Sequence, residues 1–269
     1  NHFKLLKKLE LSKKSQVKIK KYCDKKKILF LSSSFDIGSL KFLKSLKLKI
    51  FKVPSGEINN LPYLQELGSY NKKIFLSTGA SNSQDIQSAI KALVSSGTKK
   101  KNITLLHCNS EYPTPMSDAN LNAINFLKSK FKLKTGYSDH TLGIEASIAS
   151  VALGAEVIEK HFTLNKKMKG LDHATSISAS QLLQLVKSIR HIELALGKKD
   201  KFVTQSEKKN KKIIRKSIVA KKKILKNDKF LSSNITCKRP GNGLSPMKWH
   251  RVIGKKSRFH FKIDDPIKL

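Results

Sequence analysis

Polar clusters that each follow a short apolar run hold the residues best suited to chemistry in this 269-residue chain. The clusters are Ser55-Gly56-Glu57, Ser77-Thr78-Gly79, His107-Cys108-Asn109, Ser138-Asp139-His140 and Glu159-Lys160-His161. Serine-glycine and threonine-glycine turns expose hydroxyls and backbone N–H groups that suit a phosphate, and Lys52 would add a point charge beside them. His140 and His161 would bind a divalent metal such as manganese through imidazole nitrogen. The clusters therefore predict a metal- and phosphate-binding site.

Each cluster by itself also has a plain structural interpretation. A serine-glycine pair after a strand is commonly only a turn, and a single histidine there commonly just caps the strand. Five clusters at successive strand ends are harder to explain in this way. The carboxyl ends of parallel strands meet at one face, and that face carries the active site in barrels and doubly wound sheets.

The elements that would position these clusters alternate along the chain. Short apolar runs expected to form strands lie at 27–32, 51–53, 73–77, 103–107, 134–137 and 156–159. Between them, the segments 83–96, 121–130, 144–153 and 181–196 have the apolar spacing of helices, with Ser83 as the expected N-cap of the first. This alternation predicts a parallel sheet with right-handed crossovers. Six units suit either an open sheet or a (β/α)8 barrel that lacks its first two units.

The composition changes after Gly197. Residues 198–216 are polar and lysine-rich, and we expect a linker with a surface helix there. From residue 217 on, short apolar groups such as SIVA and RVIGK alternate with glycine and proline turns, which predicts a small β-rich domain. We therefore expect a barrel-type domain at 1–197, a linker at 198–216 and a small domain at 217–269.

The formal net charge of +36 would ordinarily suggest a nucleic-acid or anionic membrane partner. Yet lysine supplies nearly all of the 55 basic residues, and the arginines are Arg190, Arg215, Arg239, Arg251 and Arg258. Arginine makes the bidentate contacts that read phosphate and guanine. Because the lysines are also scattered along the whole chain, we interpret them as solvated helix faces, with no nucleic-acid partner, and keep a polyanion-binding protein as the alternative.

Other features of the sequence favour a cytoplasmic protein without disulfides. The cysteines Cys23, Cys108 and Cys237 are few, odd in number and far apart. No apolar run approaches the length of a membrane helix, and residues 1–10 lack the apolar core of a signal peptide.

Several motifs, in their order and spacing, resemble one known family. They are KVPSGEINNLPYL, FLSTGA, LLHCNSEYPTP, GYSDHTLG, EVIEKHFTL and GLDHATS, followed by CKRPGNG. Together they resemble the sialic acid synthase family, whose members make N-acetylneuraminate and related nonulosonates. The resemblance implies a (β/α)8 TIM-type barrel, here without its first units, plus a small antifreeze-like (SAF, β-clip) domain, in a domain-swapped homodimer. It also implies condensation of phosphoenolpyruvate with an N-acetylated hexosamine, typically N-acetylmannosamine, and release of phosphate.

Matched motif by motif, the resemblance implies a role for each candidate residue. His140 and His161 would bind Mn²⁺ or Mg²⁺, which polarises the aldehyde oxygen of the open-chain sugar. Phosphoenolpyruvate would be held by Lys52, Ser55, Ser77, Asn109 and Ser138. Glu57, Tyr112 and Asp172 would lie near the sugar or a metal-bound water, and Glu159 would relay a proton or orient a ligand. Arg239 would reach the acyl sugar in the partner subunit's site.

The chain also departs from the family pattern. No segment supplies the glutamate and lysine that the family's first two strands bring to the site. Ser-Thr-Pro-Phe is replaced by Ser32-Ser33-Ser34-Phe35, and Gly-Pro-Asp-His by Gly170-Leu171-Asp172-His173. Two enzymatic alternatives stay open beside the polyanion binder: another phosphoenolpyruvate-dependent aldol-type synthase, such as one making a deoxy-octulosonate phosphate, and a truncated barrel without catalysis. Within the family, the DHATS stretch at 172–176 favours neuraminate or legionaminate over pseudaminate.

Overall fold

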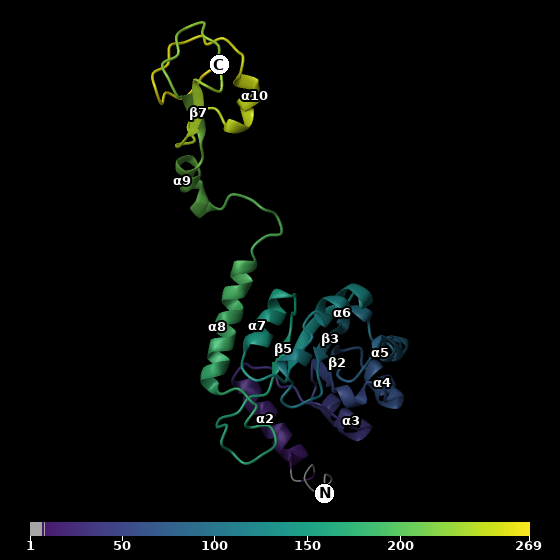
Figure 1. Cartoon of the computed structure of the whole chain (residues 1–269). Helices are drawn as coiled ribbons and strands as arrows, with labels where there is room; N and C mark the ends of the chain where they lie inside the picture. Colours follow the sequence, from purple (N-terminus) through teal and green to yellow (C-terminus); the bar gives the residue numbers. More distant parts are fainter. Residues whose placement is uncertain (1–6, 8) are drawn as a thin grey trace. The chain divides into compact units, whose positions relative to one another are not determined.

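The computed structural model describes residue 7 and residues 9–269, so most of the stretch 1–10 lies outside it. The chain folds into two compact units, Asn1–Gly197 and Lys198–Leu269. Figure 1 colours them along the sequence, from purple to yellow. Among the described helices, none combines the length and the apolar character needed to cross a bilayer.

The first unit is built on a five-stranded parallel sheet. Its strands pair in chain order and are β1 (Ile50–Val53), β2 (Lys73–Ser77), β3 (Ile103–Cys108), β4 (Lys134–Asp139) and β5 (Ile158–Lys160). The interiors of β2 and β3 are almost entirely buried, which is why both read as continuous apolar runs. Parallel neighbours joined in order by helices form part of a β/α barrel.

Helices connect the strands and lie around the outer side of the sheet (Figure 1). They are α2 (Lys13–Lys25), α3 (Ile37–Ser45), α4 (Leu61–Gly68), α5 (Ser83–Ser95), α6 (Ala123–Phe131), α7 (Glu145–Ala152) and α8 (Ala179–Leu196). The predicted N-cap Ser83 is wrong. Asn82 caps α5 in a capping box with Asp85, because its extended backbone lets the side chain accept the Asp85 N–H while Asp85 accepts the Asn82 N–H.

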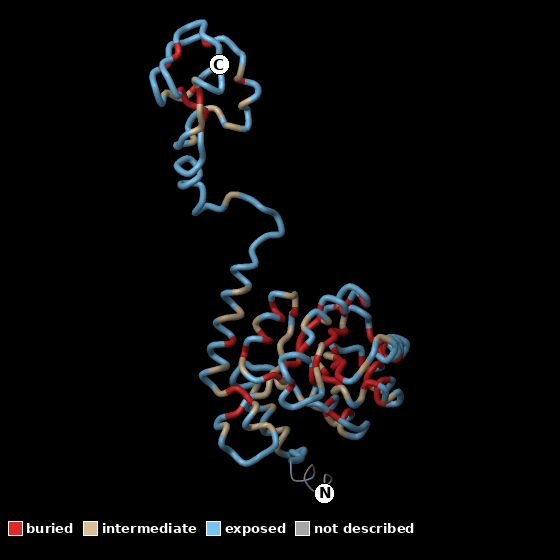
Figure 2. The backbone as a smooth tube through the Cα atoms, in the orientation of Figure 1, coloured by how far each residue is buried: buried red, intermediate tan, exposed pale blue. Residues whose placement is uncertain are grey.

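The main core lies between the sheet and the helices that cover it. Its fully buried side chains include Leu40, Tyr63, Leu67, Ile74, Leu76 and Leu93. Figure 2 shows the buried segments concentrated around the strands. A smaller cluster of Ile144, Ile177 and Leu185 packs α8 near α7. Close packing of this kind holds the strand ends, and the polar side chains that follow them, in fixed positions.

The predicted strand at 27–32 is wrong. Only Ser33 makes a bridge to β1, opposite Lys52, while Ile28 and Leu29 are 62% and 69% exposed. An apolar run forms an inner strand when neighbours on both sides pair with its backbone. In the described part of the chain no strand lies on the far side of this segment. The sheet therefore has five strands rather than the expected six.

The second unit is small and has its own core. It contains α9 (Gln205–Ile214), an antiparallel pair formed by β6 (Ser217–Ala220) and β7 (Ile235–Lys238), and the short helix α10 (Trp249–Val252). The core gathers Ile218, Ile224, Phe230, Ile235, Val252 and Phe261. The RVIGK group begins in α10 rather than in a strand, because a helical turn there places Val252 in this core.

Candidate active site

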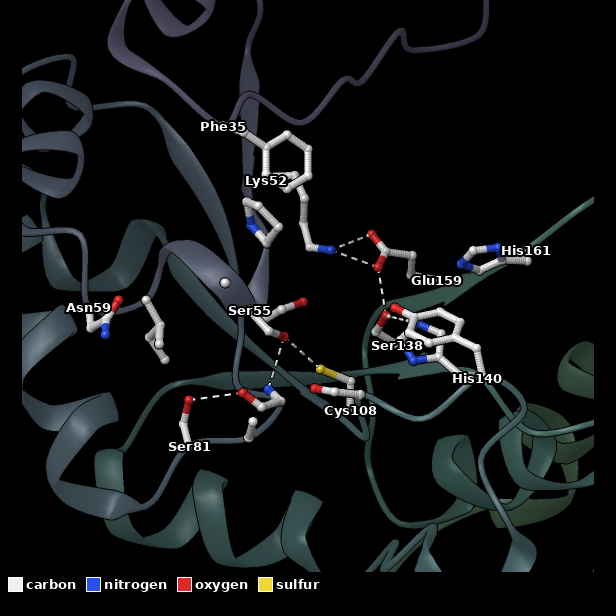
Figure 3. Close-up of a pocket in the computed structure, with 18 residues that line it drawn as sticks. Phe35, Lys52, Ser55, Asn59, Ser81, Cys108, Ser138, His140, Glu159 and His161 are labelled. Carbon is white, nitrogen blue, oxygen red and sulfur yellow. Dashed lines mark hydrogen bonds and ion pairs between the residues drawn. The ribbon is translucent and has the colours of Figure 1, made fainter. Parts of the chain in front are cut away.

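A pocket of about 580 Å³ opens where the strands of the first unit end. Every strand contributes to its lining, and Figure 3 shows how these side chains converge. They include Lys52, Ser55, Ser77, Gly79, Cys108, Tyr112, Ser138, His140, Glu159 and His161. Carboxyl ends of adjacent parallel strands lie at one edge of a sheet, so residues up to 109 positions apart in the sequence (161 − 52) meet here.

Lys52 and Glu159 form an ion pair within this pocket (Figure 3). The Lys52 Nζ donates to the two carboxylate oxygens at 2.7 and 2.9 Å, and the Ser138 hydroxyl donates to one of them at 2.6 Å. Burial by itself would raise the pKa of Glu159, but the charge of Lys52 and these hydrogen bonds outweigh it, so the pKa lies below its ordinary value. Glu159 is therefore a carboxylate at neutral pH.

Small polar groups from β1 and β2 form another wall of the pocket. The Gly79 N–H donates to the Ser55 hydroxyl at 3.0 Å. A Cβ on Gly79 would lie 2.6 Å from Ser110 Oγ and 2.8 Å from Ser55 Oγ, so the wall has room only for glycine. Ser77 is 2% exposed, and its hydroxyl has no hydrogen-bond partner among the residues described. Because a buried hydroxyl without a partner is costly, a ligand that bonds to it is favoured.

His140 and His161 face each other, with ring centroids 5.5 Å apart and ring planes at 84°. The His140 Nδ1 lies 2.6 Å from the Asn109 carbonyl oxygen. Since a carbonyl only accepts, Nδ1 carries the proton and Nε2 keeps its lone pair. Burial lowers the pKa of His140 against the opposing effect of the Asn109 carbonyl, and the proximity of His161 lowers it further. The ring is therefore neutral at pH 7, which is the form that binds metals.

The donor set around the two histidines fits an open metal site rather than a closed one. Residue 7 and residues 9–269 contain no group of three or more His, Cys, Asp or Glu side chains arranged to hold a metal. Asp172 Oδ2 lies 3.5 Å from His161 Nδ1. Structural zinc sites need four protein ligands, whereas magnesium and similar hard ions keep several water or substrate ligands. Two imidazoles with a nearby carboxylate match the second kind.

Tyr112 covers the histidine pair. Its ring stacks on His140 at a centroid distance of 4.0 Å and meets His161 edge-on at 5.5 Å. Burial raises the pKa of Tyr112 to about 12, so the phenol stays protonated at neutral pH. The ring thus shields one face of His140 from water.

Four of the residues expected at the site do not line the pocket. Glu57 accepts a hydrogen bond from Asn60 in the turn after β1, and the Asn109 side chain is engaged within its own loop, with its carbonyl rather than its amide reaching the site. Asp172 lies beside His161, 47% exposed. Arg239 belongs to the second unit, where its Nε donates to the Ile214 carbonyl at 3.0 Å.

Two lining residues were missing from the expected set, although both belong to clusters singled out in the sequence. Gly79 closes the Ser77-Thr78-Gly79 cluster, and Cys108 lies in the His107-Cys108-Asn109 cluster. The signal that would have found Gly79 is the need for a close backbone approach to a ligand, which is typical of glycine after a strand. Cys108 gives no comparable signal, since its thiol only meets Ser55 at 3.3 Å.

Comparison with known proteins identifies the family. Residues 1–201 match the NeuB family, and residues 215–269 match the SAF domain. The chain belongs to the NeuB family. Its barrel-type first unit and its SAF domain thus agree with the fold expected from the sequence.

Relatives of this NeuB-family chain include N,N'-diacetyllegionaminic acid synthase of Campylobacter jejuni, which is 48% identical over 268 residues, covering 100% of this chain and 80% of that protein. Human N-acetylneuraminate-9-phosphate synthase is 34% identical, over 96% of this chain and 72% of that protein. Among solved structures, N-acetylneuraminic acid synthetase of Leptospira borgpetersenii, in complex with citrate, superposes with a TM-score of 0.72 at 36% identity, covering 77% of this chain and 72% of that one. The NeuB-family relatives are thus synthases of sialic and related acids.

Proposed function

We propose that this NeuB-family chain condenses phosphoenolpyruvate with an N-acetylated hexosamine to give a nonulosonic acid and phosphate. The observation that carries the proposal is the composition of one pocket, which joins a buried lysine, unpaired hydroxyls and two facing imidazoles. The identity to synthases of legionaminic acid and of N-acetylneuraminate 9-phosphate supports the same class of reaction.

Phosphoenolpyruvate would occupy the side of the pocket formed by β1 and β2. Lys52 would turn from Glu159 to an anionic group of the substrate, and the free hydroxyl of Ser77 would donate to the same group. Ser55 and Ser138, with the Asn109 loop, would complete the binding of phosphate and carboxylate. A dianion entering a pocket whose one buried lysine is already paired must compete with Glu159 for that lysine.

The sugar would bind at the histidine pair. His140 and His161 would hold Mn²⁺ or Mg²⁺, and a cation bound there would polarise the aldehyde oxygen of the open-chain sugar. The enol carbon then forms the new bond to the aldehyde carbon, water adds at the carbon that carries the phosphate, and phosphate leaves. We assign Glu159 the proton of that water, since it is a carboxylate once Lys52 has moved to the substrate. Glu57, Tyr112 and Asp172 would orient the sugar.

The partner and the product are part of the same proposal. Two copies of the chain would exchange their SAF domains, so that Arg239 contacts the sugar bound by the partner subunit. The 48% identity to a legionaminic acid synthase and the DHATS stretch at 172–176 favour an acid of the legionaminate or neuraminate type.

Phosphate release tests the proposal. The chain is incubated with phosphoenolpyruvate, Mn²⁺ and a series of N-acetylated hexosamines that includes N-acetylmannosamine, and binding of phosphoenolpyruvate is measured separately by calorimetry. Release that depends on both the sugar and the metal is expected. Folded protein that binds phosphoenolpyruvate but releases no phosphate would identify the truncated, non-catalytic barrel instead. Folded protein that binds neither, but binds RNA with a steep salt dependence, would favour the polyanion binder.

A further inference from the structure

A buried ion pair that the proposed reaction does not use lies on β4 and β5. The Lys160 Nζ is 2.8 Å from Asp139 Oδ2, and the two side chains are 4% and 0% exposed. Ser138 and His140 line the pocket, so Asp139 between them points to the opposite face of the strand, where it contacts Ser147 of α7. The pair is thus buried under α7, behind the site.

The polar atoms of this pair are well supplied with partners. Asp139 Oδ1 accepts from the Thr141 backbone N–H at 2.8 Å and from its hydroxyl at 2.7 Å. Oδ2 accepts from Lys160 and from the Ser147 hydroxyl. Lys160 donates a second hydrogen bond to the Thr141 carbonyl oxygen at 2.8 Å. The network therefore ties together β4, β5, the residue after His140 and the helix that covers them.

The position of the pair relative to the histidines is specific. Asp139 and Lys160 are register partners in the β4–β5 ladder, and each directly precedes one of the two histidines. His140 is bracketed by Asp139 and Thr141, both of which bind Lys160. Any change in the Asp139–Lys160 separation must therefore move His140 relative to His161.

β5 needs such an anchor more than the other strands do. It is three residues long, its residues are only partly buried, and among the described strands it pairs with β4 alone. The His161 ring has weak side-chain contacts, the polar one being 3.5 Å to Asp172. In contrast, His140 is held by a 2.6 Å hydrogen bond and by stacking on Tyr112.

We propose that Asp139 and Lys160 are positioning residues that set the separation between His140 and His161. The inference rests on the proposed function in one respect, namely that a divalent cation is the ligand shared by the two histidines. Burying two charges carries a desolvation cost that hydrophobic residues would avoid, so a pair at this place is better explained by the geometry it imposes than by stability.

The test uses a double variant, Asp139→Asn with Lys160→Met, in the full chain. It removes both charges together, so neither is left buried and unpaired, and methionine retains most of the volume of the lysine stem. The matched control is Lys134→Met with Glu156→Gln. That ion pair joins the start of β4 to the segment leading into β5, at the other end of the same two strands, and is 62% and 42% exposed.

Two readouts are measured, and circular dichroism verifies the fold of each variant. Mn²⁺ affinity, followed by electron paramagnetic resonance, should fall about 10- to 100-fold in the double variant, as for other residues that orient a metal ligand. Hydrogen exchange of the amides at 158–162 should become faster. Phosphoenolpyruvate affinity should stay the same, because Lys52 and Ser77 belong to β1 and β2. The control should leave all three unchanged.

The outcomes separate this inference from the proposed function. Unchanged exchange at 158–162, or faster exchange with unchanged Mn²⁺ affinity, would overturn the positioning role. Equal losses in the control would reduce it to general strand stability. If the unaltered chain binds no Mn²⁺, the metal part of the proposed function fails, and the positioning role is then decided by exchange alone.

Discussion

Replacing Lys52 with methionine should weaken phosphoenolpyruvate binding by about 10- to 160-fold. A hydrogen bond to a charged group contributes about 1.5–3 kcal/mol, and about 1.4 kcal/mol corresponds to a tenfold change in affinity. The Lys52 side chain is only 9% exposed, so water screens its charge little and the loss should lie toward the upper end of that range.

Glu159→Gln separates binding from the support of the ion pair. In the unliganded pocket both Glu159 oxygens accept from Lys52, so the substrate must displace the carboxylate. Removing the negative charge should leave phosphoenolpyruvate affinity equal or higher, while phosphate release is lost. Lys52→Met should have the opposite effect on binding, because it removes the cation itself.

Isothermal titration calorimetry at fixed ionic strength is the assay, since a net charge of +36 attracts any anion when salt is low. Lys73→Met removes an exposed lysine at the start of β2 and controls for that general attraction. The reasoning is refuted if Lys52→Met binds as tightly as the Lys73 control. It is also refuted if Glu159→Gln loses as much affinity as Lys52→Met, because the pair would then be only structural.

Three further predictions concern the metal, the core and pH. His140→Ala should weaken Mn²⁺ binding by more than about 100-fold and abolish metal-dependent phosphate release, whereas His250→Ala, exposed in the second unit, should change neither. Leu105→Ala, in the fully buried part of β3, should lower the free energy of unfolding by about 2–5 kcal/mol in urea titrations, and Leu105→Met by less than about 1.5 kcal/mol. Burial lowers the pKa of His107 below 6.5, so the unfolded chain takes up its proton first as the pH falls. The unaltered chain should therefore lose melting temperature below pH 6.5 more steeply than His107→Gln.

Each of these has a contrary outcome. Retained Mn²⁺ affinity in His140→Ala would place the metal elsewhere. A loss for Leu105→Met equal to that of Leu105→Ala would mean that the site does not respond to cavity volume. Parallel melting curves for His107→Gln and the unaltered chain would show that the His107 proton is not linked to folding.

Local patterns in the sequence were enough to predict much of this protein. Continuous apolar runs marked β2 and β3 because a strand buried on both faces has no polar position. The residue after each strand was predictive because parallel strands all end at one edge of the sheet. These two rules led to the region of the pocket, including His140 and His161, without any contact information.

Other features depended on partners distant in the sequence. The run at 27–32 has the composition of a strand, but a strand also needs a neighbour, and in the described chain only Ser33 finds one. The use of the Asn109 carbonyl, rather than its side chain, to orient His140 depends on how its loop closes. No local pattern contains either fact.

The histidine pair shows the same division. Residue types and spacing by themselves determined that two imidazoles would follow adjacent strands. Only the tertiary structure decided that the rings lie 5.5 Å apart, that Glu159 is held as a carboxylate by a lysine 107 positions away, and that Asp139 and Lys160 lock the strands beneath. The physical reason is that hydrophobic periodicity and capping act between residues close in sequence, whereas pKa values and ligand geometry depend on charges that packing alone brings together.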